Sequence, residues 1–159
     1  MFGFGKKKQG PEVSIHPPVA GTIIPLSEVP DPVFSKGAMG FGFAVEPSEN
    51  TVSAPASGEL TMLFPTSHAF GIKTEEGVEI LVHIGVDTVN LKGEGFTAHA
   101  KKGDKVSVGD TIVSFEDTVR ESPEVQSMDV IVVVTNANDL NEGDLDTSAD
   151  PSKPALKLS

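Results

Sequence analysis

The sequence predicts an all-β protein, an antiparallel β-sandwich of the barrel-sandwich kind, with short strands and a few short helical turns. Sixteen glycines and twelve prolines interrupt brief runs rich in Val, Ile, Thr and Phe, a composition typical of many short strands joined by turns. Apolar residues at helical spacing are scarce along the whole chain. Both observations favour a mostly β fold.

Ten segments have the composition of strands, with β-branched or aromatic residues between turn residues. They are residues 13–16, 22–26, 43–46, 51–53, 59–64, 69–73, 78–83, 105–106, 111–115 and 129–135. The candidates for short helices are residues 27–29, 96–101 and 117–124, the last of which is broken by Ser122-Pro123.

Two Gly-Asp corners support the barrel-sandwich arrangement. Residues 102–106 and 108–112 resemble the corners of biotinyl and lipoyl carrier domains. Those carriers attach their cofactor to the lysine of a Met-Lys pair, and this chain contains no such pair. The resemblance therefore concerns the fold, and no cofactor is expected.

A length of 159 residues suits one domain, large enough to bury a core without metals or disulfides. We expect residues 1–12 to form a flexible arm that includes Lys6, Lys7 and Lys8, and residues 13–159 to form a single domain. The chain becomes polar and acidic after Asn136, so its end is predicted to be loosely held.

The composition excludes several classes of function. The chain has no cysteine, which excludes disulfide scaffolds, Cys-ligated zinc and thiol nucleophiles. A formal net charge of -11 argues against nucleic acid as a partner and favours basic proteins. No apolar run approaches the roughly 20 residues that a membrane span needs, and the N-terminus lacks the pattern of a signal peptide. The expected location is the cytoplasm.

The most informative stretch is residues 77–89, where one histidine lies inside a strand-like alternation. One face, expected in the core, carries Val78, Ile80, Val82, Ile84 and Val86; the other, expected to be a working surface, carries Glu79, Leu81, His83, Gly85 and Asp87. A second histidine, His68, lies fifteen positions upstream, across a predicted hairpin turn at residues 75–77.

The turn decides whether the two imidazoles meet, and three turns remain open. A two-residue loop at Glu75-Glu76 places His68 directly opposite His83, and a loop at Glu76-Gly77 makes them diagonal neighbours on one face. A three-residue loop with a left-handed Gly77 places them on opposite faces unless a bulge restores the register. Two of the three alternatives predict a histidine pair.

Two other interpretations of the histidines remain open at this stage. They are structural residues, one bonded in the core and one at the surface, or they bind zinc together with Asp87 as the centre of a hydrolase. Apolar residues near the histidines are expected mostly in the core, but any that are exposed would form a docking surface for another protein. The candidates for that surface are Val33, Phe34, Met39, Phe41, Phe64 and Phe70.

Residues 77–89, GVEILVHIGVDTV, resemble the signature of the glucose-type IIA component of the bacterial sugar phosphotransferase system. The resemblance extends from about residue 15 to about residue 135 and includes residues 20–22, 28–34, 54–58, 66–70, 91–96 and 108–110. It implies an antiparallel β-sandwich with short helical turns.

The resemblance also implies a chemistry. In this family the histidine matched by His83 carries a phosphoryl group, and His68 matches the second active-site histidine. His68 is expected to donate a hydrogen bond to a phosphoryl oxygen while Thr66 fixes its tautomer. Asp31 and Asp87 are expected to pair with arginine on the phosphate donor. Neutral imidazole needs no general base to act as a nucleophile.

The implied partners are a small histidine-containing phosphocarrier protein, which donates the phosphate, and the IIB domain of a sugar permease, whose cysteine receives it. A second hypothesis is a regulatory module that docks on transporters or metabolic enzymes according to its phosphorylation state. The chain departs from the family pattern at Gly40-Phe41-Gly42, where relatives often have Gly-Asp-Gly, and partner choice is expected to change there.

Overall fold

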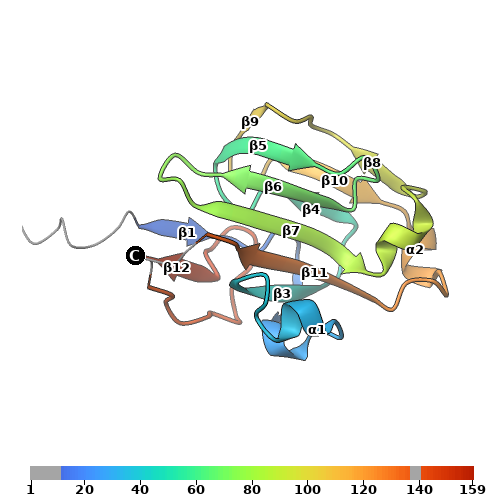
Figure 1. Cartoon of the computed structure of the whole chain (residues 1–159), viewed down its shortest axis with the longest axis horizontal. Helices are drawn as coiled ribbons and strands as arrows, with labels where there is room; N and C mark the ends of the chain where they lie inside the picture. Colours follow the sequence, from blue (N-terminus) through green and yellow to red (C-terminus); the bar gives the residue numbers. More distant parts are fainter. Residues whose placement is uncertain (1–11, 137–140) are drawn as a thin grey trace, which may run out of the picture.

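The computed structural model describes residues 12–136 and 141–159, which fold into three antiparallel sheets with short helical turns (Figure 1). The predicted all-β class is confirmed. Residues 1–11, nearly all of the expected N-terminal arm, lie outside the described residues. The strands are β1 (Val13–Ile15), β2 (Gly21–Pro25), β3 (Phe41–Pro47), β4 (Thr51–Ser53), β5 (Gly58–Leu63), β6 (Ala69–Lys73), β7 (Glu79–Val86), β8 (Phe96–Ala98), β9 (Lys105–Val106), β10 (Thr111–Phe115), β11 (Ser127–Val134) and β12 (Leu156–Leu158).

The largest sheet has seven strands in the order β2-β3-β11-β7-β6-β5-β9. A second sheet has the order β4-β10-β8, and β1 pairs with β12 as a third. The helical elements are η2 (Leu26–Glu28), α1 (Pro32–Ser35), η3 (Thr88–Leu91) and α2 (Asp117–Glu121). Within the described residues, no helix is both long and apolar enough to cross a bilayer.

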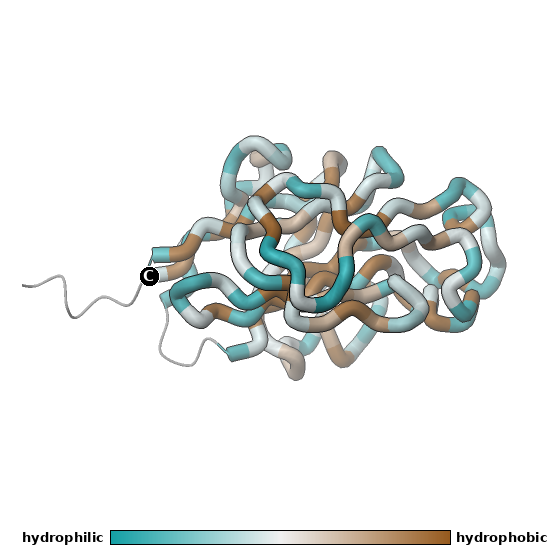
Figure 2. Tube along the Cα trace, turned by 90° about the horizontal axis from the view of Figure 1, so that it is seen from above, coloured by the Kyte–Doolittle hydropathy of each residue, from teal (hydrophilic) through white to brown (hydrophobic). Residues whose placement is uncertain are grey.

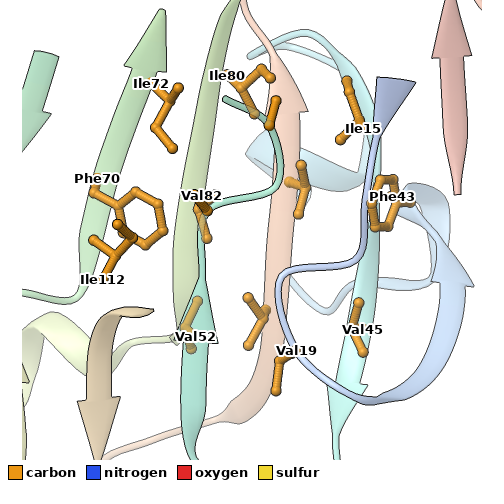
Figure 3. Close-up of a cluster of buried hydrophobic side chains, with 14 of the residues drawn as sticks. Ile15, Val19, Phe43, Val45, Val52, Phe70, Ile72, Ile80, Val82 and Ile112 are labelled. Carbon is orange, nitrogen blue, oxygen red and sulfur yellow. The ribbon is translucent and has the colours of Figure 1, made fainter. Parts of the chain in front are cut away.

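The main core lies on the inner face of the seven-stranded sheet and receives side chains from all three sheets. In Figure 3, Phe70 and Val82 of the large sheet lie in one cluster with Val52 and Ile112 of the second sheet and Ile15 of the third. Hydrophobic segments follow the interior strands and hydrophilic segments follow the outer loops (Figure 2). This aliphatic contact between sheets supplies most of the hydrophobic stabilisation of the sandwich.

A smaller apolar cluster covers part of the outer face of the seven-stranded sheet. It combines Ala44, Leu81 and Ile131 of the sheet with side chains from the segment that contains η2 and α1. Asp31 caps α1, because its carboxylate accepts the Val33 N–H at 2.9 Å, and Pro32 occupies the first helical position. In Figure 1 this short helix lies next to β3, and its buried residue Phe34 belongs to the outer apolar cluster.

Residues 96–101, predicted as a helix, instead begin with strand β8, which pairs with β10. Gly93 and Gly95 precede it with φ values of +90° and +89°, so the backbone turns before the segment starts. Pairing also brings Phe96 against Phe115, with ring centroids 6.3 Å apart. Tertiary packing therefore determines the secondary structure of residues 96–101, because the segment itself has little preference for helix or strand.

The end of the chain is more firmly held than its composition predicts. Leu156 and Leu158 of β12 are buried in the main core, and β12 pairs with β1. His16 adds a contact, since its Nδ1 donates to the Pro151 carbonyl oxygen at 3.0 Å. The prediction of a loosely held tail is therefore wrong for residues 141–159, because a few apolar residues within a polar stretch were enough to anchor it.

Candidate functional site

Strand β7 separates core residues from site residues as its alternation predicts, up to Gly85. Ile80, Val82 and Ile84 enter the main core, whereas Leu81 and His83 face the outer side. Val86 was predicted on the core side but belongs to the outer cluster. The reason is Gly85, whose φ of +79° coincides with a register shift against β11 and reverses the alternation.

The hairpin before β7 uses the three-residue loop, the alternative that predicts separated histidines. Lys73 pairs with Glu79, the Thr74 N–H donates to the Val78 carbonyl, and Gly77 has a φ of +91°. The register therefore pairs His83 with Ala69, one residue beyond His68. A direct pairing of the two histidines, as a two-residue loop would give, does not occur.

The two imidazoles nevertheless meet. Their ring centroids lie 5.1 Å apart with the planes at 82°, an edge-to-face arrangement. His68 lies just before β6 and follows Ser67, whose φ is +61°, so strand alternation does not fix the direction of its side chain. The backbone still links the pair, because the Ile84 N–H donates to the His68 carbonyl at 2.7 Å.

His83 has a defined tautomer. Its Nδ1 lies 2.8 Å from the Gly85 carbonyl oxygen. A carbonyl oxygen can only accept, so Nδ1 carries the proton and Nε2 of the neutral ring keeps a lone pair. The side chain is half-buried at the outer face of the sheet, which leaves it accessible to a reactant.

Burial lowers the pKa of His83 below its usual 6.5, and its hydrogen bond to Gly85 and the nearby Asp31 carboxylate offset part of that effect. The ring is therefore neutral at pH 7 and able to act as a nucleophile. When the ring becomes cationic, the Gly85 carbonyl and Asp31 stabilise it.

His68 is more deeply enclosed, with only 3% of its surface exposed. Its Nδ1 lies 2.5 Å from the Thr66 hydroxyl. Burial, followed by the nearby His83, lowers the pKa of His68 to about 4. It is thus a neutral imidazole whose Nε2 is available for a second hydrogen bond when the hydroxyl supports Nδ1.

Aromatic rings support both imidazoles from the side. The Phe34 ring lies 5.2 Å from the His83 ring, and the Phe64 ring lies 5.2 Å from the His68 ring in an edge-to-face contact. Phe64 is half-buried, but Phe34 has only 6% of its surface exposed. Phe34 therefore orients His83 and offers little surface to a partner, contrary to the sequence prediction.

A further prediction of a docking residue is wrong. Phe70 is completely buried in the main core, because it alternates with Ala69 on β6 and points to the opposite face. Phe41 is half-buried and packs against the main core, since its register with Val134 of β11 directs it to the inner face, and its place in the docking surface stays a prediction. By contrast, Val33 and Met39 are exposed, at 49% and 38%.

Of the two predicted aspartates, Asp31 acts on His83 through its charge, whereas Asp87 is exposed just after β7. Within residues 12–136 and 141–159, no group of three or more histidine, aspartate or glutamate side chains is arranged to hold a metal ion. The zinc-hydrolase interpretation therefore has no supporting geometry.

Gly85 is a functional residue that strand alternation does not predict. Its backbone carbonyl fixes the tautomer of His83, whereas alternation assigns it only a position on a strand face. A signal was available, because a glycine within a strand pattern marks a bulge or a close backbone approach.

Comparison with known proteins places this geometry in a family. The model for the phosphoenolpyruvate-dependent sugar phosphotransferase system, EIIA 1, matches residues 13–140. The chain belongs to this family. It is a phosphotransferase component of that system, as the sequence resemblance implies, and the phosphocarrier and the permease IIB domain are the partners of such components.

Named relatives agree with this assignment. A PTS system glucose-specific EIIA component from Halalkalibacterium halodurans is 49% identical over 146 residues, covering 88% of this chain and 83% of the relative. A protein of the same name from Oceanobacillus iheyensis is 46% identical, covering 84% and 81%. The PTS system beta-glucoside-specific EIIBCA component of Bacillus subtilis is 50% identical over 82% of this chain, but the match covers only 21% of that longer protein.

The fold agrees as well. The structure of glucose permease IIA from Mycoplasma capricolum superposes with a TM-score of 0.84 at 36% sequence identity, covering 98% of this chain and 99% of that one.

Proposed function

We propose that Nε2 of His83 accepts a phosphoryl group from a small histidine-containing phosphocarrier protein and passes it to the cysteine of a permease IIB domain. The observation that carries the proposal is the hydrogen bond of 2.8 Å from Nδ1 to the Gly85 carbonyl. It leaves Nε2 with the lone pair, on a half-buried ring next to a second imidazole.

The phosphoryl transfer needs no general base. The Nε2 lone pair forms a bond to phosphorus while the N–P bond of the donor breaks, and the electron pair of that bond returns to the donor imidazole. His83 keeps its Nδ1 proton and becomes a phosphorylated imidazolium. The Gly85 carbonyl and Asp31 stabilise that positive charge. A thiolate of the next protein then attacks phosphorus, and His83 leaves as neutral imidazole.

His68 is proposed to stabilise the transferring phosphoryl group. With the Thr66 hydroxyl donating to Nδ1, Nε2 of His68 carries the proton and is free to donate, on a ring whose centroid lies 5.1 Å from that of His83. A donor on a ring that is already held in place costs little reorganisation while charge shifts to the phosphoryl oxygens. Thr66 acts by holding the ring and by supporting the donor tautomer when its hydroxyl donates.

The surface around the pair suits a basic, partly apolar partner. Exposed Val33 and Met39 and half-buried Phe64 supply apolar area, while Asp31 and Asp87 supply negative charge. Arginine on the phosphocarrier would pair with these carboxylates and guide encounter. The net charge of -11 supports attraction of a basic surface.

The acceptor lies on another protein or domain, because this chain contains no cysteine. Two relatives are named for glucose and one for β-glucosides. The proposed final acceptor of the phosphate is therefore glucose or a related sugar. The proposed place of transfer is the cytoplasmic side of the permease. Docking on regulated transporters or metabolic enzymes stays a prediction of the family resemblance.

The test is phosphorylation of the purified protein with phosphoenolpyruvate, the first enzyme of the system and the phosphocarrier. We expect one acid-labile phosphate per chain, absent from His83→Ala. A matched control is His99→Ala, which removes an exposed histidine bonded to Ser114 and should label normally. Label that survives His83→Ala would refute the proposal.

A further inference from the structure

The carbonyl that holds His83 belongs to a backbone segment, residues 84–88, that is anchored on both sides of Gly85. The Ile84 carbonyl accepts the Thr88 hydroxyl at 2.5 Å. The Val86 carbonyl accepts the Gln126 N–H at 3.0 Å. The Ile84–Gly85 and Val86–Asp87 peptide units are therefore each held by a hydrogen bond, and they flank the Gly85–Val86 peptide unit, which carries the Gly85 carbonyl.

Thr88 controls this segment through both branches of its side chain. It is fully buried, with no exposed surface, although it carries a hydroxyl. Its methyl group occupies the space beside Gly85, because a Cβ built on Gly85 would lie 2.4 Å from Thr88 Cγ2. Gly85, with its left-handed φ of +79°, thus lies where the Thr88 methyl group leaves room only for glycine, next to a peptide that the Thr88 hydroxyl holds by a hydrogen bond.

We infer that Thr88 is a positioning residue for phosphoryl transfer, which acts on His83 through the Gly85 carbonyl. The inference rests on the proposed role of His83. Thr88 fixes the Ile84–Gly85 peptide, this fixes the direction of the Gly85 carbonyl, and the carbonyl decides which ring nitrogen of His83 carries the proton. The hydroxyl contacts neither the ring nor a partner surface.

The orientation of the Gly85 carbonyl determines whether His83 can react. When the Gly85 carbonyl turns away, Nδ1 loses its acceptor, and the proton distributes between the two nitrogens. The tautomer with the proton on Nε2 has no lone pair there and cannot form the N–P bond at that atom. Loss of the Thr88 hydroxyl therefore lowers the fraction of reactive His83 without changing the docking surface.

The test compares Thr88→Val with the wild-type chain in two measurements. In the unphosphorylated protein, ¹⁵N NMR of the histidine rings above pH 6.5 reports the His83 tautomer. We expect a single Nδ1–H form in the wild type and a mixture in Thr88→Val. The kcat for accepting phosphate should fall roughly tenfold, the loss of about one buried hydrogen bond, while KM for the phosphocarrier stays unchanged.

A second pair of variants separates the hydroxyl from packing. Thr88→Ser and Thr88→Ala both lose the methyl group, but only Ser keeps the donor. We expect the wild-type tautomer in Ser and the mixture in Ala. Wild-type tautomer and rate in Thr88→Val, or identical behaviour of Ser and Ala, would overturn the inference. Since the tautomer is read without phosphate, a failure of His83 as acceptor would appear separately, in the labelling experiment.

Discussion

The two histidines of the pair differ in what their Nδ1 atoms meet. His83 faces a carbonyl, which can only accept, whereas His68 faces the Thr66 hydroxyl, which can donate or accept. The carbonyl therefore imposes one tautomer on His83, whereas the hydroxyl is compatible with either tautomer of His68. His83 is also half-buried, while His68 is almost fully enclosed. The difference suits a fixed nucleophile beside an adaptable hydrogen-bond donor.

The largest expected effect comes from a substitution of His68, which tests whether the two histidines have different roles. In His68→Gln we expect phosphate acceptance to continue, because the nucleophile is intact, and delivery to the IIB cysteine to fall about 100-fold or more. An amide can donate a hydrogen bond, but it cannot gain positive character as charge develops. The measurement is single-turnover transfer from the labelled variant to the permease. Delivery at the wild-type rate would mean that the two rings are not divided in role.

The backbone support of His83 gives the next largest effect. Gly85→Ala should lower the free energy of unfolding by about 2–3 kcal/mol, because the new Cβ would meet Thr88 Cγ2 at 2.4 Å and the Ser127 carbonyl oxygen at 3.0 Å at a φ of +79°.

Gly77→Ala is the matched control for this substitution. Its φ is +91°, but nothing lies within 4 Å of the added Cβ, so only about 1 kcal/mol should be lost. Urea unfolding measures both variants. Equal losses would show that the close packing around Gly85 contributes nothing to the rigidity of the carbonyl.

The smallest effect is on stability as a function of pH. The pKa of His68 is about 4 in the folded protein against 6.5 as its ordinary value, so the unfolded chain binds more protons between these values. The contribution of the neutral His68 to the free energy of unfolding is therefore complete above pH 6.5 and is lost as the pH falls toward 4. Allowing for solvent screening, we expect a loss of roughly 1–2 kcal/mol.

The matching measurement is the free energy of unfolding of wild type and His68→Gln across this pH range. The variant lacks the titrating ring, so the difference between the two curves should narrow as the pH falls. Parallel curves would contradict the buried, neutral state of His68.

Much of this site could be predicted from the sequence, because strand alternation places His83 and Leu81 on one face and Val82 on the other. The meeting of His68 with His83 was predicted, but for a turn that does not occur. Ser67 and Gly85 have positive φ values outside regular strand geometry, and a rule based on period two cannot anticipate them. The contact of Thr66 with His68 could be predicted because the two residues are only two positions apart in the chain.

The missed elements depend on long-range contacts. Strand β12 needs β1, more than 140 positions away in the chain, and β8 needs β10. Phe70 was predicted as a surface residue next to His68, but the register of β6 directs it into the main core, and the register of β3 turns the half-buried Phe41 toward the same core. Such outcomes depend on which strands pair, which local composition does not specify.

The pairing of β1 with β12 places the entry and exit of the domain side by side at one end of the sandwich (Figure 1). Strand β7, which contains His83, runs from that end toward the opposite one, where η3 follows (Figure 1). The chain therefore enters at β1 and leaves at β12 at the end of the sandwich where β7 begins, and the reacting histidine comes later in that strand. One module can in this way serve as a separate carrier or as a fused segment of a longer transporter without redesign of its working face.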